Sequence, residues 1–376
     1  MLSRKPSTPG LARFGVIGTA VLAITSSLLV VPAAADPVAG APGTPPPSLS
    51  QTQIIAGVGA DADAELVDQV ATVYNAQVPA PASYLASYDA FNPVTGASET
   101  ITTKPGCPLP RPNGANTGVS ALKTNQLSTA DGVTPCIDFA RSSRAKKSDG
   151  TESSLSFYAF ARDAVTWVSI GNSYAPKSLT LAQLKGIFEC SITDWSQVGG
   201  QAGGIHVFTP PSGAATYTFF LQAIGSSLSS VATGCGSAAK PTQTNDGTSL
   251  AGDPQAIAPY AVTKWAAQRN GAPGINDLRG GAVLGEIGAP GADVAPTTTT
   301  TVAGTTYTVL NPTFAQGPQG RLLYNVVRTA SASTELKNIF NPGGFICTHQ
   351  DALIVPFGAT PLGTDTSQTN YCGQQS

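Results

Sequence analysis

The fold of this chain is constrained most by two apolar segments that lie far apart in the sequence, residues 157–170 and 321–328. Each is long enough to form a strand that crosses a lobe boundary. Strands alternate with helices over the rest of the chain, and this order predicts a mixed, mainly parallel α/β sheet in each of two lobes. We therefore expect a discontinuous first lobe, residues 51–160 and 325–376, into which a second lobe, residues 161–324, is inserted.

Hydrophobic periodicity places the individual elements. Strands are expected at residues 53–56, 137–140, 205–208 and 353–357, and helices at about 66–74, 119–127, 217–224 and 335–340, with 257–268 as a strand or turn that enters a helix. The threonine run at 297–301 is expected to form a loop or an edge hairpin.

Residues 57–59, Gly-Val-Gly, predict a tight turn. We reject a dinucleotide site there, because the acidic residues Asp61, Asp63 and Glu65 would repel a phosphate at the start of the next helix.

The clearest helix signal lies in residues 178–200, SLTLAQLKGIFECSITDWSQVGG. Thr180 is a good N-cap, and Gln183 stands three residues later, where it closes a capping box. Four apolar residues then recur at helical spacing: Leu181, Leu184, Ile187 and Phe188. The pattern predicts a short helix that packs on a core, followed by a polar, Gly-rich loop without reactive groups.

Residues 1–35 have the pattern of a secretory signal peptide: basic residues, an apolar run from 14 to 31, and three alanines at 33–35 that suit cleavage. The mature chain is then expected to begin at Asp36, with a Pro-rich linker over residues 36–50. The alternative is a retained membrane anchor, because the run is long enough to span a bilayer if it is not cleaved. We expect a secreted protein, extracellular or associated with the cell wall, without a membrane span once the signal is removed.

Composition and motifs argue against several functions. The chain has 20 Lys and Arg against 22 Asp and Glu, and no basic patch with interleaved aromatic residues, so nucleic acid is not an expected partner. Its two histidines, His206 and His349, stand in no metal-ligand or triad spacing, and we expect structural or exposed roles for both. Hydrolase motifs such as G-x-S-x-G and H-E-x-x-H are absent. We therefore expect that the protein is not an enzyme and uses neither a metal nor a cofactor.

The cysteine count is even, and in an exported chain this favours disulfides. Six cysteines allow many pairings, so the sequence alone leaves the connectivity open. We choose the sequential pairing because each pair then falls within one proposed structural segment: Cys107–Cys136, Cys190–Cys235 and Cys347–Cys372. Metal binding is the alternative, but the wide spacings without C-x-x-C do not support it.

Four stretches resemble one known family: residues 178–200, IDFARSSR at 137–144, AIAPYAVTKWAAQ at 256–268 and RLLYNVV at 321–327. They are similar to the phosphate-binding proteins that serve ABC importers, and more closely to secreted actinobacterial relatives. The resemblance covers about residues 54–362. It implies a two-lobed type II periplasmic-binding-protein fold, a small anion such as phosphate bound between the lobes, an ABC transporter as partner, and a monomer. No Cys follows the signal, so the lipid anchor usual for such proteins in Gram-positive bacteria is not expected.

The ligand loops match the family less well. Asp61 stands in the first loop, where the family has a small hydroxyl residue, and Ala115 stands where the second loop would have Ser. In the third loop Ser142 matches the family's Ser, but Ser143 stands where the family has Asp. In the fourth loop only Thr216 matches a ligand residue of the family. We therefore expect an altered ligand site built from these residues: Asp61, Arg141, Ser142, Ser143, Ser212, Gly213 and Thr216.

Two interpretations are possible for Arg141 and Arg144. Their guanidinium groups would compensate for the missing hydroxyls by binding the anion, because Arg pairs well with phosphate or carboxylate oxygens. Alternatively, with Lys146 and Lys147, they form a solvated basic turn. The resulting function hypothesis is a secreted solute-binding protein with an altered anion site. The alternative is an extracellular or surface protein that keeps the fold but has lost its ligand, and an enzyme such as a phosphoesterase ranks third.

Overall fold

The structure is a computed structural model that describes residues 36–37, 49–92, 98–210, 214–227, 229, 240–241, 244–288 and 293–376. The predicted signal segment 1–35, most of the predicted linker, and the predicted residues Ser212, Gly213 and Cys235 lie outside this part of the chain. Within it, no helix is long and apolar enough to cross a membrane.

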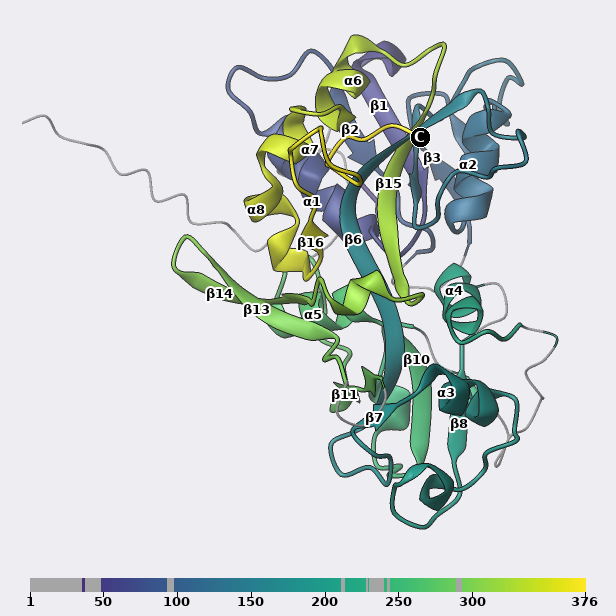
Figure 1. The fold of residues 1–376 in the computed structure, drawn as a ribbon. Helices are drawn as coiled ribbons and strands as arrows, with labels where there is room; N and C mark the ends of the chain where they lie inside the picture. Colours follow the sequence, from purple (N-terminus) through teal and green to yellow (C-terminus); the bar gives the residue numbers. More distant parts are fainter. Residues whose placement is uncertain are drawn as a thin grey trace, which may run out of the picture. The chain divides into compact units, whose positions relative to one another are not determined.

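One ten-stranded sheet runs through the described residues (Figure 1). Its main path has the order β2-β1-β5-β15-β6-β10-β8-β9, and β11 and β16 pair with β6. The strands are β1 Ile54–Gly59, β2 Tyr84–Ser87, β5 Phe139–Ser142, β6 Leu155–Ile170, β8 His206–Thr209, β9 Lys240–Pro241, β10 Ala256–Ala261, β11 Ala282–Leu284, β15 Gly320–Arg328 and β16 Thr360–Pro361.

The two long strands predicted to cross between the lobes are both present and pair with each other. β6 and β15 run antiparallel from Gly320 opposite Ala164 to Arg328 opposite Leu155. The outer strands are parallel, β1 with β2 and β5 on one side and β10 with β8 on the other. The prediction of a separate, mainly parallel sheet in each lobe is therefore corrected. The sheet is continuous and antiparallel in its middle, because the single strand β6 runs through both lobes and pairs with β15 along its first part and with β10 and β11 along its second.

Buried apolar residues form separate cores that divide along β6. Its first half, through Ala161, belongs to a core shared with β1, β2 and the C-terminal segment, whereas Ala164, Val165 and Trp167 belong to a second core. The first core thus contains residues from both ends of the described chain, which is the two-lobed arrangement with a discontinuous first lobe.

Eight α-helices cover this sheet in the described residues: α1 Ala64–Asn75, α2 Ala115–Lys123, α3 Leu181–Phe188, α4 Ala215–Ala223, α5 Val262–Asn270, α6 Thr334–Phe340, α7 Phe345–Thr348 and α8 Gln350–Leu353. The capping box predicted for α3 is confirmed, since the Gln183 N–H donates to Thr180 Oγ1 at 3.1 Å and the Thr180 N–H donates to Gln183 Oε1 at 2.8 Å. Helix α5 contributes to both cores, with Val262 in the second and Ala267 in the first.

The threonine run forms a hairpin, which was one of the two predicted alternatives. β13 (Thr297–Val302) pairs antiparallel with β14 (Thr305–Leu310) and extends away from the rest of the described chain (Figure 1). Two more two-stranded pairs are β3 (Thr100–Thr102) with β4 (Pro108–Pro110) and β7 (Ser178–Leu179) with β12 (Glu286–Ile287).

Two local predictions are wrong. The final strand expected at 353–357 is the end of α8 followed by a 3-10 turn, Val355–Phe357. Pro356 favours this turn, because its fixed φ suits the first positions of a helix and it has no N–H to give to a sheet. Residues 57–59 are not a tight turn but the end of β1. Gly57 is needed there because the ring of Phe139 occupies the space of a side chain.

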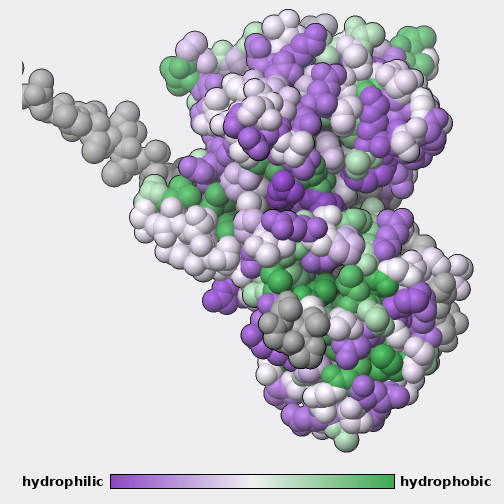
Figure 2. Space-filling model, in the orientation of Figure 1, coloured by the Kyte–Doolittle hydropathy of each residue, from purple (hydrophilic) through white to green (hydrophobic). Residues whose placement is uncertain are grey.

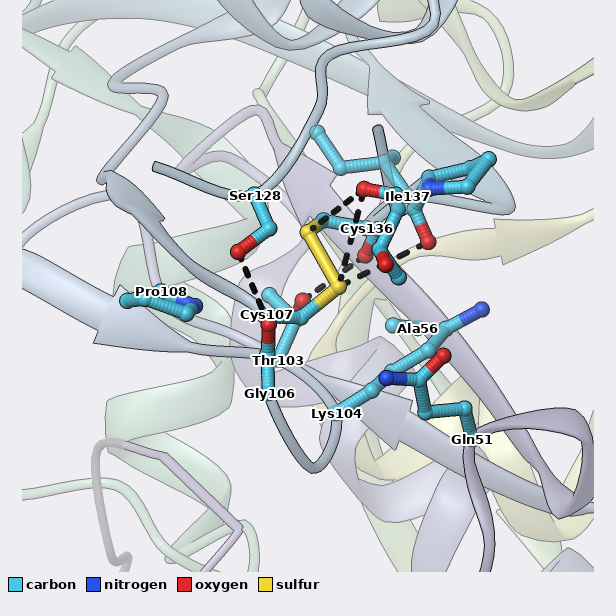
Figure 3. The surroundings of a disulfide bond; sticks show 12 residues. Gln51, Ala56, Thr103, Lys104, Gly106, Cys107, Pro108, Ser128, Cys136 and Ile137 are labelled. Carbon is cyan, nitrogen blue, oxygen red and sulfur yellow. Dashed lines mark hydrogen bonds between the residues drawn. A yellow bond between two sulfur atoms is a disulfide. The ribbon is translucent and has the colours of Figure 1, made fainter. Parts of the chain in front are cut away.

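Two of the three predicted disulfides are confirmed, Cys107–Cys136 and Cys347–Cys372. Around the first, Thr103 Oγ1 donates to the Cys136 carbonyl at 2.7 Å, and Ser128 Oγ donates to the Gly106 carbonyl at 2.8 Å (Figure 3). Cys190 is also disulfide-bonded, and its predicted partner Cys235 lies outside the described residues.

Candidate functional site

Three loops of the first lobe lie together at the ends of neighbouring elements. The Gly114 N–H, at the start of α2, donates to the Gly59 carbonyl at 3.1 Å, and the Ala60 N–H donates to the Arg141 carbonyl at 3.1 Å. Gly118 in the first turn of α2 packs directly on the Cα of Gly59, where a Cβ would clash. Backbone contacts therefore bring the loops that carry Asp61, Ala115 and Ser142 to one place.

Arg141 lies inside this loop cluster. Its side chain is fully buried, and its Nε donates to the Ala60 carbonyl at 3.1 Å. Nη1 donates to Ser87 Oγ at 2.5 Å and Nη2 donates to the Tyr88 carbonyl at 2.6 Å. The guanidinium thus holds the ends of β1 and β2 together, and all three of its nitrogens are engaged by protein oxygens.

The residues after Arg141 are also engaged. Ser142 Oγ donates to the Arg144 carbonyl at 2.8 Å, and Ser143 is buried. Arg144 pairs with Glu152 at 2.6 Å, and its Nε donates to Asn116 Oδ1 at 2.6 Å. Arg144 therefore ties α2 to the loop after β5, which is a third role beside the two that the sequence suggested.

A buried network connects β6 and β15 with α4 and α5. Asp163 is fully buried and pairs with Arg321, whose Nε lies 2.8 Å and Nη2 2.6 Å from Asp163 Oδ2. Thr263 Oγ1 donates to Asp163 Oδ1 at 2.7 Å, and Arg321 Nη2 donates to Thr216 Oγ1 at 3.1 Å. Thr216, predicted as a ligand residue, is thereby linked to both crossing strands.

The ion pair of Lys264 on α5 with Glu65 on α1 links the two lobes. Burial by itself lowers the pKa of Lys264, but the carboxylates of Glu65 and Asp61 outweigh it and hold this pKa above its ordinary value. A cavity of about 10 Å³ adjoins the pair and is lined otherwise by mainly apolar residues. Such a volume has room for a single water and not for a solute. In Figure 2, hydrophilic residues gather at the narrow middle of the visible face, and hydrophobic residues lie directly below them.

Two aspartates near this junction have raised pKa values. Asp61 is partly exposed, and burial raises its pKa above the ordinary value, with Lys264 opposing that rise and Glu65 adding to it. Asp63 is only 1% exposed, and neither of its carboxyl oxygens has a hydrogen-bond partner. Burial raises the pKa of Asp63 to about 7, although Arg141 and Lys264 oppose this.

The charge of Arg141 also acts on two further aspartates, Asp68 and Asp89. Burial raises the pKa of Asp68 to about 7. Burial and the adjacent charge of Asp68 raise the pKa of Asp89 to about 10. The surroundings of the loop cluster are thus rich in carboxyl groups. Even so, no group of three or more His, Cys, Asp or Glu in the described residues is arranged to hold a metal ion.

Sequence reasoning did not assign Asp163, Lys264 or Arg321 to the site. They could have been found because each is a charged residue within an otherwise apolar segment, a pattern that indicates a buried polar network. The histidines have the structural roles expected of them. His206 Nδ1 lies 2.9 Å from Asp253 Oδ2, and His349 stacks on Phe345.

A family model described as "PBP superfamily domain" matches residues 46–319. The chain belongs to this family. Solved structures show the same two-lobed type II periplasmic-binding-protein fold. An ABC-type phosphate transport receptor from Vibrio cholerae is 19% identical, with a TM-score of 0.52 over 82% of this chain and 99% of the receptor. A substrate-binding protein with bound phosphate from Clostridium perfringens is 15% identical, with a TM-score of 0.54 over 82% of this chain and 100% of that protein. No curated protein matches the sequence.

Within this family fold, the predicted ligand residues divide into three groups. Asp61, Arg141, Ser142 and Ser143 come together in the first lobe through the backbone contacts of the loop cluster. Thr216 lies in the buried network of Asp163 and Arg321. Ser212 and Gly213 lie outside the described residues.

Proposed function

We propose that the chain is an exported solute-binding protein of the ABC-importer type, which binds a small solute between its two lobes in an altered site. The observation that carries this proposal is the convergence of the loops of Asp61, Ala115 and Ser142, held by the bonds Gly114–Gly59 and Ala60–Arg141. The ligand class that the resemblance implies is phosphate or another small anion. The protein is proposed to act as a monomer and not as an enzyme.

The start of α2 supports an anion as the ligand class. Its N-cap is Gly114, which provides no side chain to cap the first turn. Backbone N–H groups at such a helix start bind anions without a charged side chain. In this proposal the first turn of α2 faces the solute, and Thr216 contributes from the second lobe.

A second candidate function is a surface or extracellular protein that keeps the fold and has lost its ligand. This alternative is favoured because, in the described residues, the cations near the junction between the lobes already bind protein oxygens. Arg141 bonds to Ala60, Ser87 and Tyr88, while Lys264 and Arg321 are held by carboxylates. A solute anion would have to compete with these protein oxygens.

Thermal unfolding at low ionic strength distinguishes the two candidate functions. The purified protein is heated with phosphate, sulfate, nucleotides or small carboxylates. Titration calorimetry then measures the affinity of each solute that raises Tm. A solute present at about 100 times its Kd stabilises the folded state by about 2.7 kcal/mol, which gives a clear shift. Thr216→Val, which removes one hydroxyl at the junction, should reduce the shift. If none of these solutes raises Tm, the second candidate function replaces the first.

A further inference from the structure

We propose that Arg111 forms a carboxylate-binding site on the first lobe, outside the loop cluster, whose ligand is Asp36, the first residue of the exported chain. Asp36 directly follows Ala35, where cleavage of the signal is predicted. The inference rests on export, which is one part of the proposed function. It does not require that a solute binds between the lobes.

Asp36 and Arg111 are joined by two parallel hydrogen bonds. Arg111 Nη1 donates to Asp36 Oδ1 at 2.8 Å, and Nη2 donates to Asp36 Oδ2 at 2.7 Å. The Arg111 side chain is 1% exposed, whereas the Asp36 side chain is 31% exposed. A guanidinium that binds both oxygens of a carboxylate makes a strong and geometrically specific pair. The cation therefore belongs to the body of the lobe, and the carboxylate reaches it from the surface.

The position of Arg111 is fixed by other parts of the first lobe. It directly follows β4, a strand that begins next to the disulfide-bonded Cys107. The Arg111 N–H donates to the Glu99 carbonyl at 3.2 Å, and Ser98 Oγ donates to the Arg111 carbonyl at 3.1 Å. None of these contacts involves Asp36, so the backbone of the site does not depend on its ligand.

The other acidic groups near Arg111 do not replace Asp36. Glu99 Oε1 lies 3.6 Å from Arg111 Nη2, beyond hydrogen-bond distance, and the Glu99 side chain is 44% exposed. Burial and the charge of Asp68 raise the pKa of Asp89 to about 10, so this carboxyl is neutral near pH 7. In the described residues, Arg111 Nε has no hydrogen-bond partner. Removal of Asp36 therefore leaves a buried cation without a close carboxylate, which is strongly destabilising.

Arg111 and Arg141 bind neighbouring peptide groups just after β2. Arg111 Nη1 donates to the Asp89 carbonyl at 3.0 Å, and Arg141 Nη2 donates to the Tyr88 carbonyl at 2.6 Å. Asp36 thus orients, through Arg111, the same stretch of backbone that holds the buried guanidinium of the loop cluster. Loss of Asp36 is therefore expected to loosen the end of β2.

The test uses the full chain from a host that exports it, with Asp36→Ala to empty the site. Tm is expected to fall by about 5 °C relative to wild type. The peptide Asp-Pro-Val-Ala, which has the sequence of residues 36–39, should restore at least half of this loss, and acetate should restore a smaller part. The peptide Asn-Pro-Val-Ala lacks the carboxylate side chain and should restore none.

The matched control is Asp351→Asn, which removes a carboxylate from an exposed residue of α8 and should neither change Tm nor create a response to the peptide. Amide hydrogen exchange gives a second measurement. Residues 84–89 should exchange faster in Asp36→Ala than in wild type and slow again when the peptide is added. Mass spectrometry of the exported wild-type chain should find Asp36 as its first residue.

Several results would overturn this site. They are an exported chain that begins after Asp36, an Asp36→Ala variant with wild-type Tm and exchange, and a variant whose Tm the Asp peptide does not restore. Equal restoration by the Asn peptide would also overturn it, as would an equal rise in the Tm of wild type, because the peptide would then bind elsewhere.

The proposed function fails in a different way. If no solute raises the Tm of wild type while the peptide restores that of Asp36→Ala, solute binding is refuted and the Arg111 site stands. If a solute binds to wild type but Asp36→Ala behaves as wild type does, the Arg111 site is refuted and the proposed function stands.

Discussion

The buried carboxyl of Asp63 allows a quantitative test of the electrostatics at the junction. Asp63 stands at the N-cap of α1, but its side chain makes no capping hydrogen bond. It is 1% exposed, and burial raises its pKa from 3.8 to about 7, with Arg141, Lys264 and Arg321 only partly offsetting that rise. Near neutral pH this carboxyl changes between a neutral and a charged buried group.

The sign of the effect follows from linkage. The folded state keeps the Asp63 proton to a higher pH than the unfolded chain does, so the free energy of unfolding falls as pH rises between the two pKa values. The stability is fully present below 3.8 and is lost as pH rises through about 7. At 1.36 kcal/mol per pKa unit, the full window corresponds to roughly 4 kcal/mol, and the part above pH 5 to about 2.7 kcal/mol.

The perturbation is Asp63→Asn, which removes the titration and leaves a neutral group of similar size. Urea denaturation at about pH 5 and about pH 8 gives the free energy of unfolding of both proteins. Wild type is expected to lose about 2–3 kcal/mol more than the variant between these values. Asp68 and Asp89 titrate in both proteins, so the difference isolates Asp63.

The control for this experiment is Asp351→Asn, which removes an exposed carboxyl and should keep the wild-type pH dependence. If Asp63→Asn and wild type lose equal stability between about pH 5 and about pH 8, the carboxyl of Asp63 is already ionised or already neutral over the whole range. The reasoning from burial would then be refuted.

Two further changes test what holds the first lobe together. Arg141→Met should destabilise the protein by about 3–5 kcal/mol in urea denaturation, because it leaves buried carbonyls and carboxyls without their cation; a loss below about 1 kcal/mol would show that Arg141 is not structural. Cys107→Ser combined with Cys136→Ser should cost roughly 3–4 kcal/mol, since the bridge spans a sequence separation of 29. Here an unchanged midpoint for the double variant, against wild type under oxidising conditions, would show that the bridge contributes nothing.

The sequence predicted those parts of the fold whose determinants are local. The helix of α3 is specified by Thr180, Gln183 and an apolar face within ten residues, and the capping box forms as expected. β6 and β15 were found from long apolar runs, because a strand buried on both faces has no other pattern. Sixteen consecutive residues in β6 explain why a single strand serves both cores.

Prediction was less successful where a local pattern has two meanings. Gly57 and Gly59 suggested a turn, but they extend β1 beneath Phe139 and Arg141. A glycine required for close approach and one required for a turn look the same in a sequence. The run Leu353 to Phe357 is apolar enough for a strand, and Pro356 was the signal against it.

The site was harder to predict because its contacts are not local. Arg321 reaches Asp163 across a sequence separation of 158, and Lys264 reaches Glu65 across 199. Nothing in a single sequence links such positions. The same limit applies to Arg141, where the sequence indicates a cation near an anion loop but not the three protein acceptors that engage it.

In the proposed function, the position of the site and the identity of its solute depend on different parts of the chain. The position depends on backbone contacts, such as Gly118 on Gly59 and the Gly114 N–H on the Gly59 carbonyl, which survive changes of side chain. The ligand depends on charge. A hydroxyl lost from the site forfeits one hydrogen bond, about 1.5–3 kcal/mol to a charged solute. A unit charge about 4 Å from the solute changes its energy by about 4 kcal/mol at the effective dielectric of a protein surface. In the proposed function, a charged side chain in the loop cluster therefore affects the choice of solute more than the loss of any single hydroxyl does.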